Sequence, residues 1–201
     1  MIKRFKDYDQ TKAYGNYETL PKGGYVMQIK EAKVIPNKSG NGEHLEISAD
    51  IYEGDYNGYF LKDWQNQQAE DKKWRGKFYV NIPADDGSEQ DAWTKRRFKT
   101  FTEAVEDSNE GYHFDWDETK FKGKLVGGLF NEREWEAQDG QIRKTTNWGG
   151  VTAVENIRSG DYTLPKDRLI DRGYNQPPAP ATDSNGFMSI PDGIDEEMPF
   201  K

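Results

Sequence analysis

The feature that most limits how this chain can fold is the strict alternation of apolar and polar residues over positions 44–52. Apolar side chains at every second position share one face of an extended strand, and the polar ones between them share the other. The inward-facing residues are Leu45, Ile47, Ala49 and Ile51. A similar alternation covers 24–35, and the turn-rich stretch 36–42 separates the two. These stretches predict an antiparallel hairpin.

Further elements are predicted downstream. The apolar pattern predicts strands over 76–82, 123–135 and 142–158. Residues 91–107 carry apolar side chains at the spacing that gives a helix one apolar face. The Gly127-Gly128 pair inside the fourth strand predicts a bulge or sharp bend, which a small barrel needs in order to close.

This order of elements matches an OB-fold, a five-stranded antiparallel barrel with one helix between strands three and four. Other α+β arrangements share the order. We predict a mainly β protein with an OB-fold domain over 23–172, an N-terminal arm over 1–22, and an insertion or continuation past a turn over 53–74. An OB-fold binds ligands on strands two and three, between loops that would here be 36–42 and 137–141.

The end of the chain has the composition of a flexible linker followed by an acidic motif. Residues 173–191 are rich in Pro, Gly, Ser and Asn and have too few apolar side chains to fold. Residues 192–201 place acids before Met and Phe, with a proline between them. This motif is predicted to dock into a partner pocket walled by Arg and Lys, and a solvated acidic terminus is the alternative. Its contact residues would be Asp195, Glu196, Glu197, Met198, Pro199 and Phe200.

Composition sets further bounds. The absence of cysteine excludes disulfides, thiolate nucleophiles and cysteine zinc sites, and fits a reducing cytosol. No apolar run approaches the ~20 residues of a membrane span, so a soluble protein in the cytoplasm, without a membrane partner, is expected. The core is expected to be modest, because 33% of the residues are apolar and 32% are charged.

The net charge of −8 argues at first against a nucleic-acid partner, but the basic residues are clustered. Binding of single-stranded DNA without sequence preference needs cations along the phosphates and flat rings on which bases stack. Both kinds of residue are interleaved over 59–79, and a second set surrounds the loop 137–141. The predicted DNA-binding residues are Tyr59, Phe60, Lys62, Trp64, Lys72, Lys73, Trp74, Arg75, Lys77, Tyr79, Arg133, Trp135, Arg143, Lys144 and Trp148. Each ring has a core role as its alternative, and Trp64 and Trp74 are the better surface candidates because their surroundings are the most polar.

These features together resemble single-stranded DNA-binding proteins, whose acidic tails commonly end in an apolar residue, proline and phenylalanine. The body resembles the phage-encoded branch over 52–60, 106–109 and 121–127. The resemblance implies coating of single strands during phage DNA replication and recombination. It also implies that the tail recruits helicase, recombinase, primase or polymerase in the bacterial host. The chain departs from the bacterial pattern at Lys201, which follows the phenylalanine whose free carboxylate such partners recognise.

Two other classes of function stay open. A Mg²⁺-dependent nuclease would use carboxylates such as Asp115, Asp117 and Glu118, or the pair Glu132 and Glu134. An acidic interaction module that mimics DNA would place its acids on the folded body and bind no oligonucleotide. The DNA-binding hypothesis needs no catalytic residue, cofactor or metal, and it leaves a homodimer open.

Overall fold

The computed structural model describes residues 3, 4, 6, 8, 9, 19–38, 40 and 42–170. By its internal contacts the chain divides into two units, Met1–Leu169 and Ile170–Lys201. The predicted linker 173–191 and tail motif 192–201 lie outside the described residues, as does most of the predicted arm.

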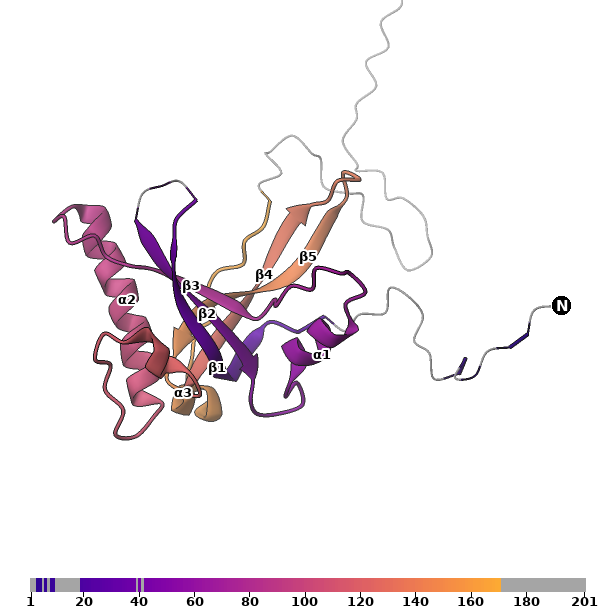
Figure 1. Ribbon diagram of the computed structural model, residues 1–201, viewed down its shortest axis with the longest axis horizontal. Helices are drawn as coiled ribbons and strands as arrows, with labels where there is room; N and C mark the ends of the chain where they lie inside the picture. The colour runs from indigo at the N-terminus through magenta and orange to yellow at the C-terminus, as the bar shows by residue number, and fades with distance from the viewer. Residues whose placement is uncertain are drawn as a thin grey trace, which may run out of the picture. The chain divides into compact units, whose positions relative to one another are not determined.

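The first unit is built on a five-stranded antiparallel sheet of order β3-β2-β1-β4-β5, with α2 and α1 on opposite sides in Figure 1. The strands are β1 (Gly23–Pro36), β2 (Glu43–Ile51), β3 (Lys77–Asn81), β4 (Leu125–Glu136) and β5 (Ile142–Thr152). The helices are α1 (Tyr59–Asn66), α2 (Glu89–Asp107) and α3 (Val154–Ser159), with a 3-10 turn at Glu118–Phe121. None of these described helices has the length and apolar character needed to cross a membrane.

The predicted strands and the long helix are present, with two corrections. The helix predicted over 91–107 is confirmed as α2. The fifth strand predicted over 142–158 is wrong beyond Thr152, because the chain turns there into α3. The stretch 53–74, expected to be an insertion or a continuation past a turn, contains the short helix α1.

The Gly127-Gly128 pair serves a different purpose from the predicted bulge. The irregularity in the pairing of β4 with β5 lies between Leu129 and Phe130. A Cβ on Gly127 would lie 2.8 Å from the Thr152 carbonyl oxygen and 2.7 Å from the Ile157 side chain. Glycine is therefore needed because α3 and the end of β5 approach the β4 backbone closely.

Hydrogen bonds do not close the sheet into a barrel. Within the described residues β3 and β5 are the two edge strands, and no backbone pairing joins them. The antiparallel sheet is therefore open. Side chains, rather than backbone groups, bring its two edges together.

A column of four aromatic rings joins these edges through the core. In order, the rings are Phe78 of β3, Trp148 of β5, Phe130 of β4 and Phe60 of α1. Successive ring centroids are 5.1, 5.7 and 6.2 Å apart, and each side chain is at most 7% exposed. Such aromatic pairs contribute about 0.5–1.5 kcal/mol each beyond the area that they bury. The ring column therefore fastens both edge strands and α1 to one core.

Trp148→Ala is expected to lower the free energy of unfolding by about 3–5 kcal/mol, because it removes a central ring and leaves a cavity. Urea denaturation followed by circular dichroism measures the change. Trp135→Ala is the matched control, since Trp135 lies on the same strand pair but is 40% exposed. Its expected effect is below about 1 kcal/mol. Equal losses of unfolding free energy in the two variants would contradict the stabilising role of the ring column.

Candidate nucleic-acid interface

Two of the rings predicted to stack bases are core residues instead. Phe60 and Trp148 belong to the buried ring column, and Trp148 donates its indole N–H to the Gly150 carbonyl oxygen at 2.8 Å. A base cannot reach either ring, so both predictions are wrong. The reason is register: Trp148 lies opposite Phe130 on the strand face that points into the core.

Tyr59 and Trp74 are half-buried and pack against the same core. The Tyr59 hydroxyl accepts a hydrogen bond from the Leu20 backbone N–H at 3.2 Å. Trp74 directs its indole N–H to the carbonyl oxygens of Ala49 and Gly76, at 3.1 and 3.2 Å. The prediction of Trp74 as a surface ring is therefore corrected. Its polar sequence neighbours face solvent while Trp74 itself turns towards the sheet.

The remaining predicted rings are the exposed ones, Trp64 at 38%, Tyr79 at 50% and Trp135 at 40%. They lie on three different elements, α1, β3 and β4. The stretch 59–79 therefore does not form one continuous strip, and the predicted interface is divided among three places.

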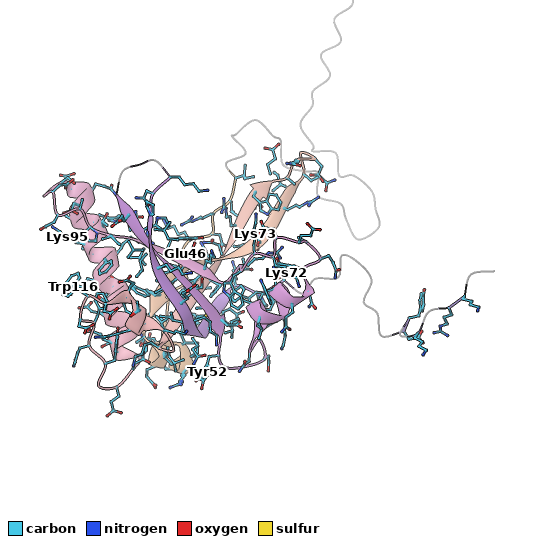
Figure 2. All side chains as sticks on the ribbon, viewed as in Figure 1. Glu46, Tyr52, Lys72, Lys73, Lys95 and Trp116 are labelled. Carbon is cyan, nitrogen blue, oxygen red and sulfur yellow. The ribbon has the colours of Figure 1, made fainter. Side chains whose placement is uncertain are left out.

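The first place is α1 with the loop that follows it, where Figure 2 labels Lys72 and Lys73. The Lys72 ammonium lies 5.2 Å from the centroid of the Trp64 ring, within the range of a cation–π contact. Arg75 pairs with Asp63 at 2.9 Å, so part of the positive charge here is balanced. The predicted cations of this place, all exposed, are Lys62, Lys72, Lys73 and Arg75.

A buried carboxylate of β2 fixes the position of α1. Gly58 caps this helix without a side chain, and Asp50 supplies the missing acceptor. One Asp50 oxygen accepts the backbone N–H groups of Ile51 and Phe60 at 2.9 Å, and the other accepts that of Leu61 at 3.2 Å. Asp50 thus connects the surface of α1 to the core of the sheet.

The second place is the outer face of β2 and β3, where Lys77, Tyr79 and Glu46 lie. Lys77 pairs with Glu46 at 2.7 Å, which balances its charge. Tyr79 lies directly opposite Glu46 in the strand pairing. Partial burial, and then the Glu46 carboxylate, raise the pKa of the Tyr79 hydroxyl. This face offers one half-exposed ring and little net positive charge.

The third place is the outer half of the β4–β5 hairpin, whose two faces differ in chemistry. Trp135 lies opposite Arg143, and Arg133 lies opposite Thr145, so these four side chains share one face. The opposite face carries Lys144, which pairs with Glu132 at 2.6 Å. Of the predicted residues on this hairpin, Arg133, Trp135 and Arg143 are therefore brought together, and Lys144 is separated from them.

A fourth residue, which the sequence did not predict, joins this face. Arg168 forms a parallel bridge with Arg133, and partners in a bridge project from the same side. The Arg168 backbone N–H donates to the backbone carbonyl oxygen of Glu132 at 2.8 Å. The Arg168 carbonyl oxygen accepts from the backbone N–H of Glu134 at 2.9 Å. The segment around Arg168 has no alternating pattern, so only the backbone pairing reveals its position. We name Arg133, Trp135, Arg143 and Arg168 the hairpin patch.

The hairpin patch has more positive than negative charge. Arg143 pairs with Asp139 at 2.7 Å; the Gln141 backbone N–H, and then Arg143, lower the pKa of that carboxyl group. Among the described residues, no ion pair engages Arg133 or Arg168. Two unpaired guanidinium groups beside an exposed indole can hold phosphates and receive a base.

Of the carboxylates considered for a metal, all but Glu118 are engaged with lysines. Lys120 pairs with Asp115 and lies 3.9 Å from Asp117, and Lys144 contacts Glu132. Over the described part of the chain, no group of three or more His, Cys, Asp or Glu residues is arranged to hold a metal ion.

Comparison with known proteins does not assign the chain to a family. No protein-family model matches it, and no curated protein matches it either. The resemblance to phage single-stranded DNA-binding proteins thus stays a prediction from the sequence.

Asp50→Ala is expected to lower the free energy of unfolding by about 1.5–3 kcal/mol, because three backbone N–H groups lose a charged acceptor. Amide hydrogen exchange should also quicken over 59–66. The matched control is Asp55→Ala, an exposed acid before the same helix, with an expected change within about 0.5 kcal/mol. Unchanged exchange in α1 of the Asp50 variant would show that another contact holds the helix.

Proposed function

We propose that this protein binds single-stranded DNA without sequence preference and protects it during phage DNA replication and recombination. The observation that supports this most is the hairpin patch, an exposed indole beside three guanidinium groups on one strand face. Guanidinium groups bind phosphate oxygens, and a flat ring stacks any base. The net charge of −8 does not oppose this function, because the positive charge is local.

The fold that we propose for this function is an OB-fold in which no backbone hydrogen bonds join the two edge strands described above. Its support is the antiparallel order β3-β2-β1-β4-β5, the position of α2 between β3 and β4, and the Phe78–Trp148 contact across the edges. The OB-fold is a partly open barrel, and it presents ligands beside the loop between strands four and five. The hairpin patch lies next to that loop.

The surface of α1 is the second contact in this proposal. Trp64 and Lys72 offer a ring and a cation there. This contact is the weaker one, because Asp63 and Asp71 lie among the cations and pair with Arg75 and Lys73.

The C-terminal motif completes the proposal. Residues 195–200 would recruit replication or recombination proteins in the cytoplasm of the bacterial host, through acids and the apolar Met198 and Phe200. This part rests on the sequence alone, because the motif lies outside the described residues. Lys201 would weaken the binding of any partner that requires a terminal phenylalanine carboxylate.

Trp135→Ala is expected to weaken the binding of oligo(dT) by about 5- to 150-fold, the equivalent of one lost base stack. Arg133→Ala is expected to weaken binding and to reduce the slope of log K against log salt by about 0.7, the value for one phosphate contact on a single strand. Fluorescence anisotropy of a labelled oligo(dT), titrated at several salt concentrations, measures both effects.

The matched control for Arg133→Ala is Lys144→Ala, which removes the same charge from the opposite face of the same hairpin. Its ammonium already pairs with Glu132, so little change is expected. Absent or salt-independent binding by the unmodified protein would refute the proposed function. Equal effects of the Arg133 and Lys144 variants would refute the assignment to the hairpin patch.

A further inference from the structure

A cavity of about 750 Å³ lies beside α2, in a different part of the molecule from the hairpin patch. Its apolar walls come from β1, β2, the end of β3, α2 and the loop before the 3-10 turn. The main apolar lining residues are Val34, Leu45, Ile82, Phe98, Phe114 and Trp116. In Figure 2, Trp116 lies by α2 on the side of the molecule away from Lys72 and Lys73. We name this cavity the α2 groove.

One ring of the α2 groove is unusually exposed. Trp116 is 80% exposed, and its ring stacks on Phe98 with centroids 6.2 Å apart and planes inclined by 7°. Phe114 contacts both of these rings, with its centroid 5.5 Å from that of Trp116 and 6.1 Å from that of Phe98. The Trp116 backbone has φ of 67°, a conformation that bulky side chains rarely adopt. The loop thus holds a large apolar side chain in a strained conformation at the mouth of an apolar cavity.

The charge around the α2 groove is negative. The Lys95 ammonium pairs with Asp85 and, at 2.8 Å, with Asp91, so its charge is balanced. Lys99 pairs with Glu103 at 3.4 Å. Two further carboxylates line the groove, Glu106 and Glu118. Among the described residues, no ion pair engages Glu118.

We infer that the α2 groove binds a basic amphipathic segment of a partner protein, with apolar side chains against Trp116 and Phe98 and with Lys or Arg beside Glu118. Apolar walls with excess carboxylates are complementary to such a segment in both polarity and charge. The carboxylates of the groove would repel an acidic peptide, and they would repel the phosphates of a nucleic acid. The inference is independent of DNA binding, because it uses no residue of the hairpin patch.

The test is the binding of a fluorescein-labelled peptide of Leu and Lys, with the leucines at i, i+3, i+4 and i+7 spacing, to the full chain. We expect saturable binding that Trp116→Ala weakens about tenfold or more, as for an anchor residue at the centre of an interface. Glu118→Lys should also weaken it, and a peptide with Glu in place of Lys should not bind.

Trp93→Ala is the matched control, because Trp93 lies on α2, is 48% exposed and does not line the groove. It should leave peptide affinity unchanged, and the Trp116 variant should leave oligo(dT) affinity unchanged. No binding, or equal binding by the Trp93 and Trp116 variants, would overturn the inference. A change in the oligomeric state of the chain alone on Trp116→Ala would also overturn it, because the occupant would then be a second copy.

Discussion

The contact between Phe78 and Trp148 is the interaction on which the rest of this structure depends. It joins β3 to β5, which are the two edge strands of the described sheet and share no backbone hydrogen bonds. In a chain with 33% apolar residues, large rings must supply much of the buried area. The column continues through Phe130 to Phe60, so the position of α1 depends on the same packing. The surfaces proposed to bind DNA are therefore held in position by buried rings that would not contact it.

The β4–β5 hairpin contributes both to the packing of the core and to the hairpin patch. In the inner half of this hairpin, Phe130 and Trp148 point into the core. Further out, the same face carries a carboxylate–lysine pair, and the opposite face carries the hairpin patch. Because side chains alternate with a period of two, a shift of one residue in register would exchange these faces. The register that buries Trp148 is thus the register that exposes Trp135.

The sequence predicted what depends on local pattern and missed what depends on register and pairing. Alternation located the strands, and the apolar spacing located α2. Trp135 and Trp148 lie on paired strands, yet one is exposed and the other is buried, because the register of β4 against β5 decides which face each occupies. Arg168 could not be found from pattern, since it joins the patch through backbone pairing alone. Helix α1 was missed because its eight residues depend on Asp50, a distant acceptor.

In the proposed complex, Trp135 contacts a DNA base and the rings beside α2 do not. Ultraviolet cross-linking of the full chain to oligo(dT), followed by peptide mapping, tests it most directly, because an aromatic side chain must touch a base in order to cross-link. We expect attachment at Trp135 and none at Trp93 or Trp116. Attachment confined to Trp93 or Trp116 would contradict this proposal.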